Sequence, residues 1–225
     1  ELVLPRKVDS GIQTYLSRKR GSKVRVRVPQ KGDKKKLLDL VEKNVRARFL
    51  GPVENVEALG DALGLARPPK IIECFDVSHL SGTSMTASMV RFEDGKPDKS
   101  NYRRFKIRAV SKVDDFAAIK ETVSRRYARL QKEKAEMPDL IVIDGGKGQL
   151  SSAKKSLEEL DLDIPIISLA KQFEEIFMPG RGEPIRLAKK SKALHLLQAI
   201  RDEAHRFAIK YNRLLRKKKI RDDKL

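Results

Sequence analysis

The chain has 225 residues, with 50 Lys or Arg against 31 Asp or Glu, which gives a formal net charge of +19 at pH 7. A single cysteine excludes a disulfide framework and a cysteine-based zinc cluster, and no apolar run approaches the roughly 20 residues that cross a bilayer. These features predict a soluble, cytoplasmic protein whose partner is a polyanion, nucleic acid before a membrane surface. The chain begins at Glu1 without a methionine or a signal segment, so we interpret it as a fragment of a longer protein.

Residues 1–68 predict a small leading module of mixed α and β structure. Valines alternate with cations over residues 24–28, which indicates a half-exposed strand. Apolar residues recur at helical spacing over residues 34–50, and a second short helix is expected after them. Pro68 and Pro69 then break the chain, and we place the domain boundary there.

The main domain is expected over residues 69–215, and its first part predicts an antiparallel meander. Its three strands are expected over residues 71–77, 85–93 and 101–108, with a turn over residues 94–97.

Helices and buried strands alternate in the second part of this domain. Residues 140–143 are all apolar, which indicates a central parallel strand that is buried on both faces. The element order predicts an α/β domain in which helices flank a mixed sheet of the meander and parallel strands. The other elements are expected as a helix over 114–134 that Asp114 caps and that buries a stripe including Phe116, a helix over 147–160, a strand over 164–169, a hairpin over 177–187, a helix over 191–215 and a basic linker tail over 216–225.

Two aspartates stand where a metal site would be expected. Asp76 lies inside an apolar strand, where a carboxylate is costly without a cation or hydrogen bonds. Asp144 ends the buried strand, and ligand sites in such sheets gather at the carboxyl ends of strands. Together the two carboxylates would suit Mg²⁺ or Mn²⁺. The alternative is structural: Asp144 caps the following helix and Asp76 marks a strand end.

The segment Gly145-Gly146-Lys147-Gly148 follows Asp144 directly. Its spacing does not match a Walker A loop, so nucleotide hydrolysis is weakly supported. A tight turn that frees Asp144 and offers Lys147 to a phosphate is favoured.

Three histidines are present, His79, His195 and His205. His205 stands at the edge of the apolar stripe of the last helix, where it is either a metal ligand or a partly buried polar residue. Asp202 and Glu203 precede it, and either is an alternative ligand.

Cations interleave with aromatic residues over residues 102–106, as in a groove that follows a nucleic-acid backbone. Each of these cations alone could simply lie on a solvated surface. Taken together with the net charge of +19, they favour nucleic-acid binding. The predicted DNA-binding residues are Arg103, Arg104, Lys147, Arg125 and Arg126.

Five segments of the chain match one protein family. Each match alone is weak evidence, but the five matches in the same order are specific. They are Glu73-Cys74-Phe75-Asp76-Val77-Ser78-His79, Tyr102-Arg103-Arg104-Phe105, Asp114-Asp115-Phe116-Ala117-Ala118, Ile143-Asp144-Gly145-Gly146-Lys147-Gly148-Gln149-Leu150 and Arg201-Asp202-Glu203-Ala204-His205. Together they resemble the C-terminal half of the UvrC family, the nuclease subunits of the bacterial UvrABC excinuclease. The leading module resembles the segment just upstream.

The resemblance implies an RNase H-like endonuclease domain that makes the 5′ incision in nucleotide excision repair, and the element order agrees with that fold. It implies that Asp76, Asp144 and His205 are catalytic and bind Mg²⁺ or Mn²⁺, with Asp115 as a further catalytic acid. His205 is a departure from relatives whose site has a fourth carboxylate in place of this histidine.

The implied partners are double-stranded DNA and, in the full-length protein, the complex of UvrB with DNA. The N-terminal nuclease, the partner-binding region and a paired helix-hairpin-helix of the family are absent from this chain. Two other functions stay open: a non-catalytic basic module that docks nucleic acid for a larger complex, and another RNase H-like nuclease such as a resolvase.

Overall fold

The computed structural model describes residues 1–45, 51–80, 84–107, 114–170 and 174–222, and the chain forms two compact units, Glu1–Gly51 and Pro52–Leu225. The division lies earlier than the boundary that the two prolines suggested. Helix α3 (Gly51–Leu63) explains the difference, because its buried residues Val56, Leu59 and Leu63 belong to the core of the second unit.

The first unit holds a parallel pair of strands and two helices. Strand β1 (Leu2–Val3) pairs with β2 (Val26–Arg27), which lies within the predicted strand. Helix α1 (Ser10–Arg20) was not predicted, although Asp9 caps it by accepting a hydrogen bond from the Gly11 N–H. Helix α2 (Asp33–Val45) is the predicted amphipathic helix, and its expected last turn lies outside the described residues.

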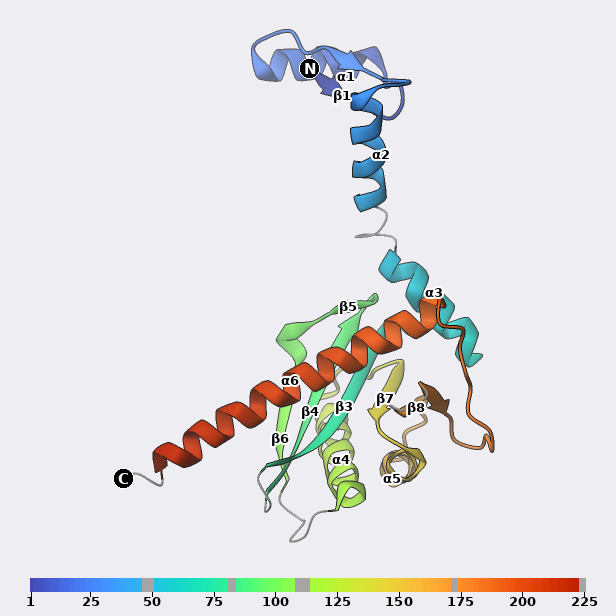
Figure 1. The fold of residues 1–225 in the computed structure, drawn as a ribbon, viewed down its shortest axis with the longest axis vertical. Helices are drawn as coiled ribbons and strands as arrows, with labels where there is room; N and C mark the ends of the chain where they lie inside the picture. The colour runs from blue at the N-terminus through green and yellow to red at the C-terminus, as the bar shows by residue number, and fades with distance from the viewer. Residues whose placement is uncertain (46–50, 81–83, 108–113, 171–173, 223–225) are drawn as a thin grey trace. The chain divides into compact units, whose positions relative to one another are not determined.

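The second unit is built on a seven-stranded mixed sheet with the order β5-β4-β3-β7-β8-β9, in which β6 also pairs with β4 (Figure 1). Strands β3, β4 and β6 form the predicted antiparallel meander, and β7 runs parallel to both β3 and β8. Every residue of β7 is buried, as its apolar sequence predicted. The strands are β3 (Ile71–Leu80), β4 (Ser84–Glu93), β5 (Lys96–Pro97), β6 (Arg103–Lys106), β7 (Leu140–Asp144), β8 (Ile166–Ala170) and β9 (Glu175–Phe177).

Helices cover both faces of this sheet (Figure 1). Helices α4 (Asp115–Glu133) and α5 (Lys147–Glu158) bury one core against it, and α3 and α6 (Lys192–Asp222) bury the other. Because successive side chains of a strand point to opposite faces, β3 sends Cys74 to the α6 side and Phe75 to the α4 side. This alternation decides which polar residues can meet.

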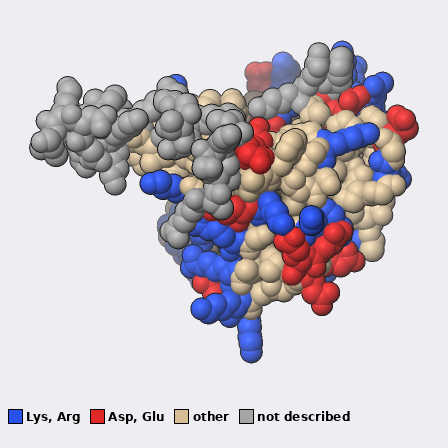
Figure 2. All heavy atoms as spheres, turned by 90° about the horizontal axis from the view of Figure 1, so that it is seen from below, with Lys and Arg blue, Asp and Glu red and all other residues tan. Residues whose placement is uncertain are grey.

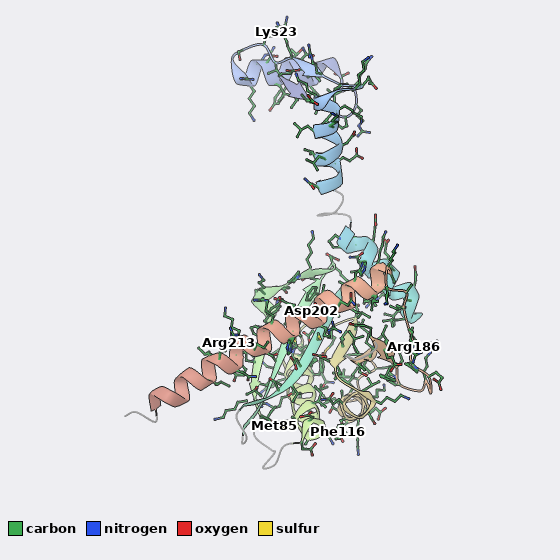
Figure 3. All side chains as sticks on the ribbon, viewed as in Figure 1. Lys23, Met85, Phe116, Arg186, Asp202 and Arg213 are labelled. Atoms are coloured by element: carbon green, nitrogen blue, oxygen red, sulfur yellow. The ribbon has the colours of Figure 1, made fainter. Side chains whose placement is uncertain are left out.

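Some local features differ from the sequence predictions. Phe116 was expected on the buried stripe of α4, but it is 54% exposed, because it lies in the first turn of the helix, before the buried stripe begins at Ala118 (Figure 3). Helix α6 continues to Asp222, so the expected linker tail begins as helix. The predicted hairpin is present as a pair of backbone hydrogen bonds of 3.0 and 2.8 Å between Ile176 and Ile185. None of the described helices is long and apolar enough to cross a membrane.

Candidate metal centre

The sheet register brings the two predicted aspartates together. Strands β3 and β7 pair Cys74 with Val142 and Phe75 with Ile143, so the next step along both strands sets Asp76 beside Asp144. Cys74 and Val142 both face the core under α6. Since residues two apart on a strand share a face, both carboxylates also lie on the α6 side. Both residues are buried.

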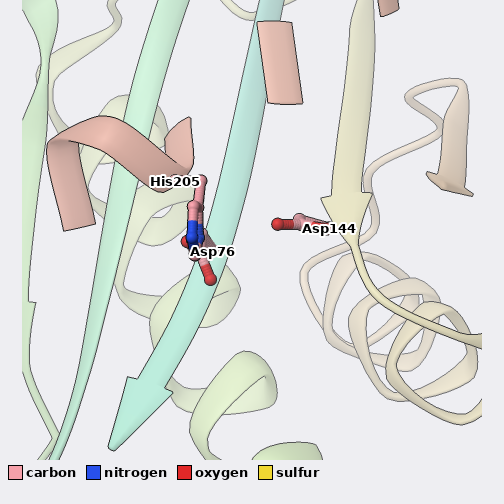
Figure 4. Close-up of side chains that lie close together, drawn as sticks. All are labelled: Asp76, Asp144 and His205. Atoms are coloured by element: carbon pink, nitrogen blue, oxygen red, sulfur yellow. The ribbon is translucent and has the colours of Figure 1, made fainter. Parts of the chain in front are cut away.

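Helix α6 supplies the third member of the group. Its buried residues Ile200 and Ala204 fix the helix against the sheet, and His205, next to Ala204, is exposed at the edge of this contact. The Nδ1 atom of His205 lies 3.5 Å from Oδ2 of Asp76. One ligand atom from each of Asp76, Asp144 and His205 lies within 4.8 Å of the others (Figure 4).

This set of donors fits a divalent metal. Carboxylate oxygens are the ligands that Mg²⁺ and Mn²⁺ prefer, and a neutral imidazole nitrogen completes many transition-metal sites. A cation between Asp76 and Asp144 would also offset the repulsion between two carboxylates held close together away from water. The arrangement can therefore hold a metal at the carboxyl end of β7, with His205 on the solvent side.

Cys74 lies two residues before Asp76 on the same face of β3 but is fully buried. Burial raises the pKa of the Cys74 thiol well above its ordinary value, and the nearby carboxylates of Asp144 and Asp76 raise it further. The thiol therefore stays protonated at neutral pH, and a protonated thiol is a poor metal ligand.

The alternative ligands on α6 have other partners. Glu203 accepts a hydrogen bond of 2.8 Å from the Tyr102 hydroxyl and also pairs with Arg206, which lowers the pKa of the Glu203 carboxyl. Asp202, labelled in Figure 3, is paired with Arg201 at 3.1 Å. Arg201 also donates to Glu174 at 2.7 Å, a contact that no pattern in the sequence indicated. A pocket of about 300 Å³ opens here, and it is lined by Glu174, Arg201, Asp202 and His205.

The starts of α4 and α5 meet next to the aspartates. Asp114 caps α4, as predicted, because its Oδ1 accepts hydrogen bonds of 3.0 Å from the Phe116 and Ala117 N–H groups. The Phe116 ring lies against Gly148, where an added Cβ would stand 2.5 Å from a ring carbon. Asp115 is half-buried in the first turn of α4, and among the described residues it is not a member of the Asp76, Asp144 and His205 group.

The other histidines lie outside this group. His195 is exposed and its Nε2 is 3.0 Å from the Lys189 carbonyl oxygen. The side chain of His79 is not among the described ones.

Several predicted DNA-binding cations are accessible. Arg104 is exposed, and its guanidinium lies 4.8 Å from the Phe207 ring centroid and 5.4 Å from that of Tyr211, both on α6. Arg125 is exposed and donates to the Lys106 carbonyl, and Arg103 is half-buried and donates to nearby carbonyls. On the face drawn in Figure 2, Lys and Arg side chains are densest at lower left and Asp and Glu side chains form a group at lower right, with others of both signs scattered between them. The net charge is therefore unevenly distributed over that face.

Arg126 corrects the prediction of a DNA contact, because it is buried and bonded inside the protein. Its Nε and Nη2 donate to the Glu73 carboxylate at 3.2 and 2.5 Å, and the Tyr127 hydroxyl donates to the same carboxylate at 3.0 Å. Burial and the neighbouring Glu73 raise the pKa of Tyr127. The sequence carried one unused signal for this network, an acidic residue inside the apolar strand β3. A phosphate cannot reach Arg126 without breaking it.

Comparison with known sequences gives a consistent result for both units. The family described as "UvrC RNAse H endonuclease domain" matches residues 60–209, and "UvrC Ribonuclease H-like domain" matches residues 1–50. UvrABC system protein C of Methanosarcina mazei is 56% identical over 97% of this chain and 42% of its own length. The protein of the same name from Prosthecochloris aestuarii is 47% identical over 97% of this chain and 38% of its own. The chain thus spans about two fifths of the length of these relatives.

Solved structures also resemble the chain, at low sequence identity. Human ENDOV is 12% identical, with a TM-score of 0.42 over 77% of this chain and 97% of its own. Endonuclease V of Ciona intestinalis, in complex with an inosine-containing DNA, is 16% identical, with a TM-score of 0.36 over 72% of this chain and 69% of its own.

Proposed function

Because the chain belongs to the family of UvrC RNase H endonuclease domains, we propose that it is the nuclease that makes the 5′ incision in nucleotide excision repair. The observation that carries the proposal is the group of Asp76, Asp144 and His205, whose ligand atoms lie within 4.8 Å of one another. In the full-length protein the substrate would be damaged double-stranded DNA, delivered as its complex with UvrB. The cofactor would be Mg²⁺ or Mn²⁺, bound by these three side chains.

The residues of the site divide the work between holding the cofactor and placing the DNA. Asp76 and Asp144 would hold the cation, and His205 would complete the ligand set from the solvent side. The bound cation would supply Lewis-acid stabilisation of the scissile phosphate and a more acidic water. Arg104 and Lys147 would position the sugar-phosphate backbone, which contains no sequence information and suits a nuclease that cuts beside any lesion.

Asp115 has a role in this proposal that does not involve binding the metal. It stands in the first turn of α4, whose Phe116 contacts Gly148 in the segment that follows Asp144. We propose it as a further acidic residue required for incision, separate from the three metal ligands.

The proposal is tested by incision of a lesion-containing duplex by the full-length protein with its UvrB partner and Mg²⁺. Asp76→Asn and Asp144→Asn should each lower 5′ incision by about a hundredfold or more, the scale on which one electrostatic group acts in a transition state. DNA binding should stay near wild type, because removing a carboxylate reduces repulsion of phosphates. Asp61→Asn, at an exposed position on α3, is the matched control. Incision within a few-fold of wild type in either site variant would instead support the non-catalytic docking function.

A further inference from the structure

A groove of about 460 Å³ lies between α5 and the end of β9 with the residues that follow it. One wall is the face of α5 with Lys147, Leu150, Lys154 and Glu158, which recur at helical spacing. The opposite wall comes from residues 177–181. The complete lining is Lys147, Leu150, Ser151, Lys154, Lys155, Glu158, Phe177, Met178, Pro179, Gly180 and Arg181.

Positive charge dominates this lining. Four cations, Lys147, Lys154, Lys155 and Arg181, face the groove, and Glu158 is the acidic residue of the lining. Lys155 and Arg181 are exposed, and Lys154 has a long contact of 3.6 Å with the fully exposed Asp163. Such a groove attracts an anion and gives it several cations to bind.

Part of the lining is nevertheless apolar. Leu150 is buried, and Phe177 and Met178 are half-buried beside it. The Lys147 ammonium lies 5.1 Å from the centroid of the Phe177 ring, so charge and aromatic surface stand side by side. A ligand that matches both features carries a negative charge and a flat apolar group, which is the chemistry of a nucleotide unit.

The groove begins close to the metal ligands. Lys147 stands three residues after Asp144, and three residues of chain span at most about 11 Å. Lys147 also donates a hydrogen bond of 2.8 Å to the Gly182 carbonyl, which joins the two walls at this end. A strand that leaves a phosphate at Asp144 would therefore meet the groove within a few nucleotides.

We propose that this groove binds an unpaired stretch of the DNA strand next to the scissile phosphate. One base would rest against Phe177 and Met178, while its phosphates contact the groove cations. The base must be unpaired, because a base in a duplex is stacked on both faces and cannot enter a pocket. This inference rests on the proposed nuclease function, which it extends by assigning a second binding site for the substrate strand.

The test is the equilibrium affinity of this chain for a fluorescent dT12 and for a base-free oligomer of the same length. Wild type should bind dT12 at least about fivefold more tightly than the abasic oligomer, the range of one stacked base. Arg181→Glu should weaken binding of both oligomers by about fivefold or more, since it replaces an attraction for phosphate with a repulsion. Phe177→Ala should weaken dT12 binding and leave abasic binding unchanged. Lys132→Glu, at an exposed position near the end of α4, is the matched charge control and should change each affinity less than Arg181→Glu does.

Equal affinity of wild type for the two oligomers would overturn the inference, and so would wild-type affinity for dT12 in Arg181→Glu or Phe177→Ala. A melting curve verifies that Phe177→Ala is folded, and the wild-type comparison decides the base dependence even where that variant is not. The assay needs no incision, so it separates the groove from the nuclease.

Discussion

The Nδ1 atom of His205 lies 3.5 Å from Oδ2 of Asp76, which joins the last helix of the chain to the first strand of its main sheet. Contacts on both sides of His205 fix this part of α6. Before it, Glu203 binds the Tyr102 hydroxyl, and after it, Asn212 accepts a 3.0 Å hydrogen bond from the Thr86 hydroxyl. The position of the histidine therefore depends on contacts of α6 with β4 and with Tyr102, the residue just before β6.

Substitutions at His205 and at Asp202 should show which of the two residues is the third metal ligand. His205→Ala should raise the Mn²⁺ concentration required for half-maximal incision by about tenfold or more, because even groups that only orient a ligand contribute about tenfold to metal affinity. Asp202→Asn should change it little, because Asp202 is exposed and paired with Arg201. A metal titration of incision by the full-length protein measures both. The reverse order of effects would assign the ligand to Asp202.

The buried Glu73–Arg126 pair should contribute to stability and not to DNA binding. Arg126→Met leaves a buried carboxylate without its cation, which should lower the free energy of unfolding by about 3–5 kcal/mol in urea titrations. The double variant Glu73→Leu, Arg126→Met removes both charges and should recover much of that loss. The affinity of folded Arg126→Met for duplex DNA should equal that of wild type. Unchanged stability together with weaker DNA binding would restore Arg126 as a DNA contact.

The Phe116 ring should restrict residue 148, at the start of α5, to glycine. Gly148→Ala places a Cβ 2.5 Å from a carbon of the Phe116 ring, far inside van der Waals contact, so the ring or the helix start must move, with a loss of about 1–3 kcal/mol in stability. Phe116→Ala alone should be mild, because Phe116 is 54% exposed. The double variant should regain the stability of Phe116→Ala in thermal unfolding. A double variant as unstable as Gly148→Ala would show that the ring is not the obstacle.

Cys74 should not react with alkylating reagents in the folded protein. Burial raises its thiol pKa, and alkylation requires the thiolate. Iodoacetamide at pH 8 should therefore modify it only after unfolding, as followed by mass spectrometry. The raised pKa means that the folded state keeps the Cys74 proton at a pH where the unfolded chain has lost it. Ionisation of the thiol therefore favours the unfolded chain, and the free energy of unfolding should fall as the pH rises above about 8.5. Alkylation at the rate of a free thiol would contradict the buried position.

The sequence predicted the main sheet well because its signals are local. The continuous apolar run of β7 and the turn at residues 94–97 that ends the run of β4 indicate strands without any distant contact. The positions of the site were predictable in part, since a carboxylate inside the apolar strand β3 and another at the end of β7 stand out in the sequence. The pairing of β3 with β7 that sets Asp76 beside Asp144 was not, because it depends on the strand order of the folded sheet. The burial of Arg126 was not, because a cation on a helix is indistinguishable from a surface residue until Glu73 is known to face it. The groove between α5 and residues 177–181 likewise depends on packing between segments that share no motif.

The central claim is that Asp76, Asp144 and His205 hold one divalent cation, and the most direct measurement is a crystal of this chain soaked in Mn²⁺. The anomalous difference map should show a peak between the Asp76 and Asp144 carboxylates, within about 2.0–2.5 Å of an oxygen of each and near an imidazole nitrogen of His205. The same soak of Asp76→Asn should give a much weaker peak. Full-length protein that incises DNA while these three side chains bind no Mn²⁺ would contradict the account.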